Sequence, residues 1–332
     1  MPKRLVIASA GEIRWQDITD RTPSPNEIRV KPEFGVEKHG TMAAFVKGYA
    51  NERGSWDNQV RIHRPGGVLW NYPVPLGNMQ FGRTEQGERV AWWGPFEDTA
   101  VVGSSSLLKL DETDWQDAAM QDPSEFALGA LRDGGVRIGD TVAVFGLGAI
   151  GLAVVQLARV AGASKVFALD PIASRRAVAE TYGAIAINPI EGDPGLALRE
   201  GTDMLGVDVA IDFSGSWQAL QTAFRGVAYG GTIAYGAFPA PFPAGLDLGG
   251  EAHMNRQRLV FTRACSDPNP DYPRWSEARI RKTVWDLIKR GAIKGAGIVD
   301  DPVPFSDLES VYPQIAAHPE KCLKLSVAYP AQ

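Results

Sequence analysis

The chain has 332 residues, enough for two domains with an ample apolar core between them. Hydrophobic residues make up 44% of it and charged residues 22%, as in an ordinary soluble protein. The net charge of −5, with no block of Lys or Arg, argues against binding to nucleic acid or an anionic membrane, and no apolar run is long enough to span a bilayer.

The first ten residues, Met1–Ala10, are predicted to form an opening strand. Their basic start resembles a signal peptide, but Gly11–Arg14 ends the apolar stretch too early for one. Only two cysteines occur, Cys265 and Cys322, which fits thiols that serve as small core residues in a reducing cytoplasm. The sequence therefore predicts a cytoplasmic protein and excludes a zinc lobe held by four cysteines.

Residues 1–123 are predicted to form an irregular, mostly β domain. They are rich in Gly, Pro and aromatic residues, and short β-like runs occur at 27–30 and 88–93. The stretch Gly48–Pro75 is loop-like and polar, and we expect it to shape the mouth of a pocket.

From residue 124 to 266, predicted strands alternate with helical patterns. This alternation is typical of a doubly wound parallel sheet, an α/β fold that binds its ligand at the carboxyl ends of the strands. The six predicted strands are 141–145, 165–169, 184–187, 207–212, 231–235 and 258–262.

The tail begins at about residue 267. An amphipathic helix is predicted at 276–289, with an apolar face made of Ile280, Val284, Leu287 and Ile288. A β-like stretch at 302–305, a short helix capped by Asp307 and a last strand at 323–327 follow. We expect the tail to rejoin the first domain, so that residues 124–266 are inserted between 1–123 and 267–332.

The turn after the 141–145 strand reads Gly146-x-Gly148-x-x-Gly151. Gly146 allows a tight turn, Gly148 lets the backbone approach a pyrophosphate, and Gly151 lets the next helix pack closely on the strand. The amino end of that helix offers free N–H groups to phosphates. A glycine motif alone is weak evidence for nucleotide binding, but a strand, turn, helix and strand in this order predict a dinucleotide-binding site.

Asp170 ends the second strand at the spacing expected for a carboxylate that binds the adenosine ribose. It favours NAD, because a carboxylate accepts hydrogen bonds from the 2′-hydroxyl and repels a 2′-phosphate. Arg175 and Arg176 could neutralise such a phosphate, or they are solvated helix residues. The predicted cofactor contacts are Gly146, Leu147, Gly148, Ala149, Ile150, Gly151, Asp170, Arg175, Ser214, Gly215 and Ala237.

These motifs, in this order, resemble the medium-chain dehydrogenase/reductase superfamily of zinc alcohol and polyol dehydrogenases. The resemblance covers nearly the whole chain, and its signposts are 77–82, Asp122-Pro123, 146–151, 208–215, 230–233 and 322–325. It implies a Rossmann domain with a six-stranded sheet, inserted into a mostly β, GroES-like catalytic domain. It also implies oxidoreductase activity on a small molecule and a homodimer or homotetramer.

The chain departs from the zinc-dependent members where they bind the metal. Their Cys, His and Glu ligands correspond here to His39, Asn78 and Met79. A thioether and an amide are poor ligands for Zn²⁺, so no bound metal is expected. The segment Gly35–Met42 is more similar to zinc-free members of the superfamily.

Without a metal, a side chain must accept the proton when an alcohol is oxidised. His39 is a candidate because the unperturbed pKa of histidine is about 6.5, and Lys38 is the other. Thr41 matches the relay hydroxyl of the family segment, unless it only caps a helix that begins at Met42. Asp122 could orient His39, or it could simply begin a helix ahead of Pro123. Glu125, in the same predicted helix, is expected to face solvent.

The substrate is predicted to be a sugar or polyol. Aromatic rings gather in the first domain, where they either stack on a sugar ring or form the core of the β domain; they are Trp56, Trp70, Tyr72, Trp92, Trp93 and Phe96. The predicted substrate contacts are Asn78, Trp93, Tyr72 and His63.

The leading hypothesis is a zinc-independent, NAD-dependent dehydrogenase that oxidises a secondary alcohol of a sugar or polyol. The first alternative is a zinc-free enone or quinone reductase that uses NAD(P)H, and the second is a nucleotide-binding protein without activity.

Overall fold

The computed structural model describes residues 1–263, 271–318 and 320–331. The chain divides into two compact units, one made of Met1–Ala119 with Val299–Gln332 and the other of Met120–Ile298. The first unit is therefore interrupted in sequence by the second. Cys265 and the expected boundary at 266–267 lie outside the described residues.

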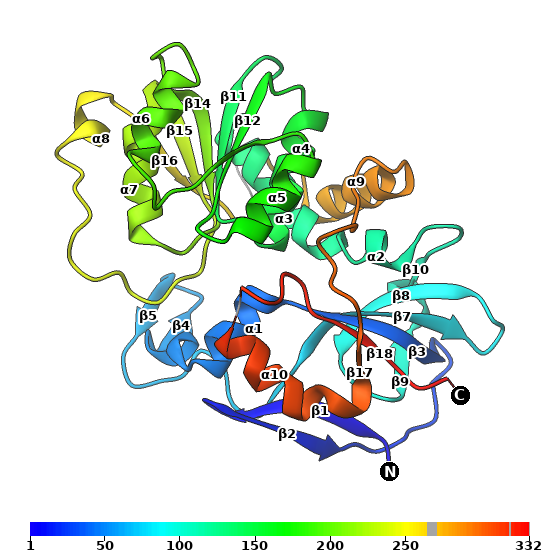
Figure 1. The fold of residues 1–332 in the computed structure, drawn as a ribbon. Helices are drawn as coiled ribbons and strands as arrows, with labels where there is room; N and C mark the ends of the chain where they lie inside the picture. Colours follow the sequence, from blue (N-terminus) through cyan, green and yellow to red (C-terminus); the bar gives the residue numbers. More distant parts are fainter. Residues whose placement is uncertain (264–270, 319, 332) are drawn as a thin grey trace. The chain divides into compact units, whose positions relative to one another are not determined.

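The second unit is built on a parallel sheet whose order is β13-β12-β11-β14-β15-β16 (Figure 1). Within the described residues the sheet has six strands, as predicted, in the order typical of a Rossmann fold. Their bounds are β11 (Thr141–Phe145), β12 (Lys165–Leu169), β13 (Ile185–Ile187), β14 (Val207–Asp212), β15 (Val227–Tyr235) and β16 (Arg258–Phe261). The carboxyl ends of β11 and β14, where the strand order reverses, are the expected place for a ligand.

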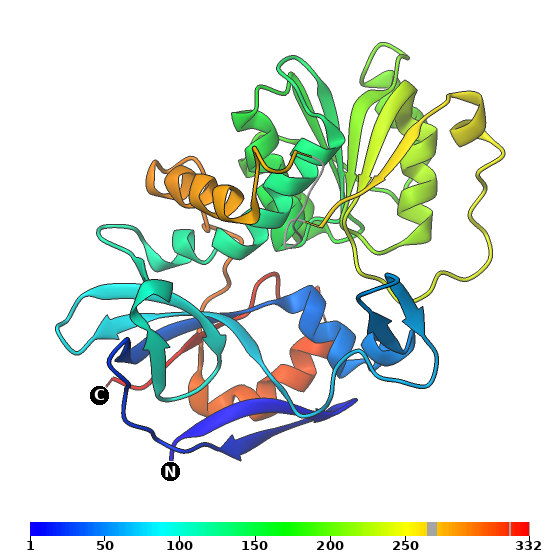
Figure 2. The same ribbon diagram turned by 180° about the vertical axis from the view of Figure 1, so that it is seen from behind.

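Helices cover both faces of this sheet (Figures 1 and 2). One face carries α3 (Gln121–Gly134), α4 (Ala149–Val160) and α5 (Ala173–Thr181), and the other carries α6 (Pro194–Glu200) and α7 (Trp217–Gly226). A four-residue helix, α8 (Glu251–Met254), precedes β16. Apolar side chains of these strands pack together in a buried cluster, which explains why periodicity located the strands well.

The predicted helix at 276–289 is α9 (Glu277–Lys289), capped by the Ser276 hydroxyl. Its buried face consists of Ile280, Val284 and Ile288 and packs on α3. The helix thus belongs to the second unit, whereas we expected it in the first. Sequence alone does not reveal the partner of an apolar helix face, and the chain returns to the first unit only at Val299.

The first unit is mostly β, as predicted, and within the described residues it contains three sheets. A small one pairs β2 (Glu12–Asp17), β1 (Lys3–Ser9) and β6 (Val74–Pro75), and a hairpin pairs β4 (Ser55–Asp57) with β5 (Ile62–Arg64). The largest runs in the order β10 (Leu108–Lys109), β8 (Arg89–Pro95), β7 (Gly77–Thr84), β3 (Glu27–Glu37), β18 (Ser326–Ala328) and β17 (Val303–Pro304), with β9 (Ala100–Gly103) beside the first half of β3. The stretch Gly48–Pro75 is therefore more regular than the loop we expected.

Three α-helices belong to the described part of the first unit, α1 (His39–Val46), α2 (Trp115–Ala118) and α10 (Leu308–Ala317). Short 3₁₀ turns lie at Tyr49–Asn51, Ser104–Ser106 and Phe305–Asp307. The predicted last strand at 323–327 begins three residues later, because the N–H groups of Leu323 and Lys324 donate to the Asp300 carboxylate instead of to a neighbouring strand.

The aromatic rings of the first unit have different environments. Trp92 and Phe96 are buried, while Trp93 and Tyr72 are half-buried. Trp56 and Trp70 are 39% and 54% exposed, so these two are not core residues. The thiol of Cys322 is buried in the core of this unit, as predicted.

No helix in the described part of the chain is long and apolar enough to cross a membrane. The homo-oligomer stays a prediction.

Candidate functional site

The turn between β11 and α4 has the geometry that its glycines predict. Gly146 adopts φ +83°, and a Cβ there would lie 2.6 Å from the Ser214 Cα. A Cβ at Gly151 would collide with the carbonyl oxygen of Gly146. At Gly148, by contrast, a Cβ would meet no protein atom within 4 Å. The space over Gly148 is therefore free to receive a pyrophosphate at the amino end of α4.

Asp170 lies immediately after β12 and is 4% exposed. Its Oδ2 accepts a hydrogen bond from the Leu147 N–H at 2.8 Å, and its Oδ1 accepts one from the Ile172 N–H at 2.8 Å. These bonds fix the carboxylate against the glycine turn. Each oxygen keeps a further lone pair for a ribose hydroxyl.

Two arginines flank this carboxylate. Arg175 Nη1 lies 3.8 Å from Asp170 Oδ2, and Arg176 donates to the main-chain oxygen of Asp170 at 2.7 Å. Arg176 is therefore half-buried against the turn rather than fully solvated. The other predicted cofactor residues, Ser214, Gly215 and Ala237, follow the carboxyl ends of β14 and β15.

Asp212 is a buried acid that our sequence reasoning did not select. It ends β14 beside Phe145, is fully buried, and accepts hydrogen bonds from the Ser214 N–H and hydroxyl. Burial raises the pKa of Asp212 to about 6, although the bonds from Ser214 oppose the shift. The signal was a carboxylate at the end of a buried strand, at the edge where ligands bind.

The predicted catalytic segment lies at the end of β3. Antiparallel pairing of β3 with β7 puts Asn78 opposite Glu37, one residue before Lys38. Lys38 is half-buried at the start of α1. Thr41 lies within the first turn of α1, because the helix begins at His39; a helix starting at Met42 is therefore wrong. The side chain of His39 lies outside the described part of the structure.

Asn78, Met79 and Trp93 lie together on β7 and β8, where Met79 is paired with Trp93. The Asn78 Nδ2 is buried and has no hydrogen-bond partner among the described residues. A buried amide without a partner is costly, and it is readily explained by a ligand that supplies an acceptor. Met79 is completely buried in the sheet.

Glu37, directly before Lys38, is fully buried and is a second residue that the sequence did not single out. The Tyr312 hydroxyl of α10 donates to its carboxylate. Lys324, 3% exposed, donates from Nζ to the Glu37 main-chain oxygen at 3.0 Å. Three buried polar side chains thus hold the end of β3, and nothing in the local pattern distinguishes them from core positions.

Two of the predicted substrate residues have structural contacts. The Tyr72 hydroxyl donates to the Phe45 carbonyl of α1 at 2.6 Å. His63 contacts the Trp56 ring, with centroids 5.0 Å apart. The His63 Nδ1 is buried and has no partner among the described residues. His63 therefore keeps an unused hydrogen-bonding atom, whereas the hydroxyl of Tyr72 is already engaged.

Asp122 and Glu125 belong to the second unit. A helix does begin here, with Gln121 as its first residue and Asp122 buried in its first turn. Glu125 is also buried, whereas we expected it to face solvent. The α9 helix covers this side of α3, and Gln121 Nε2 donates to Glu125 Oε1 at 2.7 Å. Burial raises the pKa of Glu125 to about 7, while Gln121 and Arg281 oppose the shift.

Replacing Glu125 with Gln is expected to remove a pH-dependent loss of stability. Because the folded-state pKa is about 7 against an ordinary 4.5, the protonated carboxyl stabilises the fold fully below pH 4.5. This contribution is lost as the pH rises through 7, and it amounts to about 3 kcal/mol. Urea unfolding at about pH 5 and about pH 8 measures it.

The control for this experiment is Glu200→Gln, because Glu200 is exposed at the end of α6. It should leave the pH dependence of stability unchanged. If the free energy of unfolding of Glu125→Gln depends on pH as it does in the wild type, ionisation of Glu125 is not the cause of the pH-dependent loss of stability.

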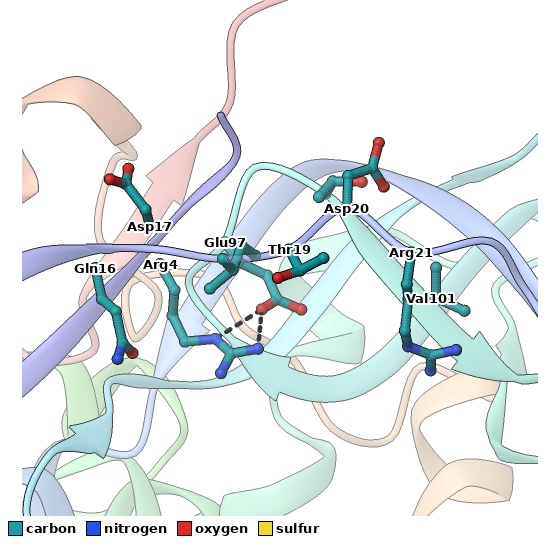
Figure 3. A pocket seen from close by; sticks show the side chains of 10 residues that line it. Arg4, Gln16, Asp17, Thr19, Asp20, Arg21, Glu97 and Val101 are labelled. Atoms are coloured by element: carbon teal, nitrogen blue, oxygen red, sulfur yellow. Dashed lines mark hydrogen bonds and ion pairs between the residues drawn. The ribbon is translucent and has the colours of Figure 1, made fainter.

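A cavity of about 460 Å³ in the first unit contains none of the predicted site residues (Figure 3). It is lined by charged and polar groups that include Arg4, Asp20, Arg21 and Glu97. Arg4 is paired with Glu97 at 2.6 Å and Arg21 with Glu27 at 2.6 Å, so these cations are already neutralised. The cavity lies apart from the end of β3 and carries no part of the site.

Comparison with known proteins agrees with this geometry. Residues 149–276 match the family described as zinc-binding dehydrogenase. A D-guloside 3-dehydrogenase of Escherichia coli K12 is 38% identical to this chain. The match covers 98% of this chain and 100% of the relative. The chain belongs to the medium-chain dehydrogenase/reductase superfamily. It is accordingly an oxidoreductase that acts on the CH–OH group of a small molecule and binds NAD(P).

Solved structures of the superfamily share its fold. The 2R,3R-butanediol dehydrogenase of Bacillus subtilis superposes with a TM-score of 0.78, at 21% identity, over all of both chains. A short chain alcohol dehydrogenase from E. coli CFT073, solved with NADH, gives 0.75 at 20% identity, over 98% of this chain and 99% of its own. The predicted α/β architecture is confirmed.

Two of the three positions at which zinc-dependent members of the superfamily hold the metal carry unusual zinc ligands in this chain. At the ligand positions stand the Asn78 amide and the Met79 thioether, and Met79 is completely buried in its sheet. Within the described part of the chain, no group of three His, Cys, Asp or Glu residues could hold a metal ion. These two groups are poor ligands for Zn²⁺, which prefers thiolate, imidazole and carboxylate groups; the third ligand position holds an imidazole, that of His39.

Proposed function

We propose that this protein is a zinc-independent, NAD-dependent dehydrogenase that oxidises a secondary alcohol of a sugar or glycoside. The observation that carries the proposal is the similarity to a D-guloside 3-dehydrogenase along nearly the whole chain. A relative of that length and identity supports a carbohydrate substrate, in agreement with the sequence-based prediction of a sugar or polyol.

The preference for NAD rests on Asp170. Its carboxylate is fixed by two backbone N–H groups beside the glycine turn, so it is already oriented toward the expected ribose. A 2′-phosphate in the same place would meet a buried negative charge. Arg175, at 3.8 Å, is already engaged with that carboxylate.

Bound NAD⁺ supplies the hydride acceptor. This chain must then bind the hydroxyl and remove its proton, and Lys38 and His39 are the proposed bases at the end of β3. Thr41 is proposed to pass the proton on. Asn78, with its unpartnered amide N–H, is proposed to donate to a substrate oxygen. Trp93, Tyr72 and His63 complete the proposed substrate contacts.

The test is NAD⁺ reduction at about 340 nm by protein dialysed against a strong chelator, with methyl D-guloside, sugars and polyols as substrates. We expect turnover to survive chelation unchanged, because the buried Met79 and the Asn78 amide offer no zinc site. Activity that is lost on chelation and restored by Zn²⁺ would contradict zinc independence.

The same plate tests the reductase alternative. Wells with NADH or NADPH and enones or quinones should show no consumption of the nicotinamide. If only these wells react, the protein is a double-bond reductase and the role proposed for His39 is wrong.

A further inference from the structure

The Trp70 side chain is large, apolar and exposed, and the main chain that carries it is fixed. It is 54% exposed, although indoles normally bury most of their surface. Asn51 holds the backbone on either side of it: Asn51 Oδ1 accepts from the Leu69 and Trp70 N–H groups, each at 3.0 Å, and Nδ2 donates to the Trp70 oxygen at 3.0 Å. A single side chain thus makes three bonds that fix the main chain at Trp70.

The indole also contacts the helix that begins at the predicted catalytic segment. The Phe45 ring of α1 meets the Trp70 ring edge to face, with centroids 5.7 Å apart and planes at 85°. Phe45 is itself buried, so it anchors the exposed ring to the core of the unit. Phe45 follows Thr41 by four residues and therefore lies on the same side of α1, about 6 Å along the helix.

We propose that the exposed face of Trp70 is a stacking site for the pyranose ring of the substrate. This inference rests on the proposed function and specifies its substrate class as ring-form sugars and their glycosides. The C–H groups on one face of a pyranose are apolar and weakly positive, which complements the negative face of an aromatic ring. Because Asn51 already fixes the loop, binding costs little ordering of Trp70.

An exposed tryptophan could instead belong to the apolar core or to a contact between copies of this chain, and the position of the Trp70 ring distinguishes substrate stacking from both. A core role would require burial, as at Trp92 on β8, whose side chain is 1% exposed. A contact between copies of this chain would also use an exposed aromatic. The fixed loop and the nearness of Phe45 to Thr41 favour the substrate, and the experiment below includes the contact between copies as an outcome.

Saturation-transfer NMR and calorimetry with methyl D-guloside, on enzyme saturated with NADH so that no turnover occurs, measure this binding directly. Trp70→Ala should weaken the affinity about tenfold, and Trp70→Phe should stay within about threefold of the wild type, because it keeps a ring. Asn51→Ala should fall between them, since the ring remains but its loop is released. The affinity for NADH should not change in any of the three.

The control is Tyr229→Ala, which removes an aromatic ring that is 66% exposed on β15 of the other unit. It should bind the glycoside as the wild type does, and circular dichroism checks that each variant is folded. Methyl D-guloside bound equally well by Trp70→Ala and wild type would overturn the inference. So would a wild type that binds no methyl pyranoside.

Two further outcomes separate the inference from the proposed function. Wild type that binds the glycoside through Trp70 but reduces no NAD⁺ with it would contradict the proposed dehydrogenase and still support the stacking site. A change of oligomeric state in Trp70→Ala, measured by sedimentation and accompanied by unchanged affinity for the glycoside, would assign the ring to a contact between copies and overturn the inference.

Discussion

Replacing His39 with Ala is expected to lower kcat about 10²- to 10⁴-fold, the usual contribution of a general base, while the affinity for NAD stays the same. The expectation follows from its position at the start of α1, beside Lys38 and two residues after Glu37, which pairs with Asn78 of β7. Stopped-flow and steady-state measurements with the glycoside give kcat, and fluorescence titration with NADH gives cofactor affinity.

The parallel variant Lys38→Met decides which of the two neighbours is the base. The variant with the larger loss of kcat, and with a loss of the acid limb in the pH profile, identifies it. His253→Ala is the matched control, because His253 is exposed on α8 in the other unit. Wild-type turnover in His39→Ala would remove His39 from the mechanism.

Asp170→Ala is expected to raise the KM for NAD⁺ about tenfold or more and to improve the relative use of NADP⁺. The charged hydrogen bonds to the ribose are each worth about 1.5–3 kcal/mol, and the variant also removes the charge that repels a 2′-phosphate. Arg175, which lies 3.8 Å from the carboxylate, is then available to that phosphate. The ratio of kcat/KM for the two cofactors is the measurement.

Asp170 also accepts two backbone hydrogen bonds, which Asp170→Ala removes. The control variant must therefore also remove two hydrogen bonds from an aspartate of this sheet. Asp208 accepts from the Thr141 N–H at 2.7 Å and from the Thr141 hydroxyl at 2.8 Å, at the amino ends of β14 and β11 and so at the other end of the strands from the glycine turn. Asp208→Ala should therefore lower stability without changing cofactor preference. An unchanged preference in Asp170→Ala would refute its ribose role.

The second unit could be predicted from the sequence because its strands are buried on both faces. Such strands read as short apolar runs, and β11, β12 and β14 have the bounds that were predicted. The glycine turn was equally readable, since its conformation requires residues without a side chain. The partner of α9 could not be read in this way, because an apolar stripe does not specify which surface covers it.

The first unit was less predictable, because its site depends on contacts between distant segments. Glu37 and Lys324 are far apart in the sequence and meet only through the pairing of β3 with β18. Glu125 looked exposed because local sequence carries no information about the arrival of α9. The position of Trp70 depends on Asn51, nineteen residues earlier, in a stretch without helical or strand periodicity.

The interrupted first unit has a consequence for biosynthesis. Strand β3 needs β18 as its neighbour, and Glu37 needs Tyr312 and Lys324, all of which leave the ribosome after the whole of the second unit. The nascent first 119 residues therefore wait with an unfinished sheet edge, while the second unit can already fold. During that interval the unpaired edge of β3 is the part of the nascent chain most in need of protection from aggregation.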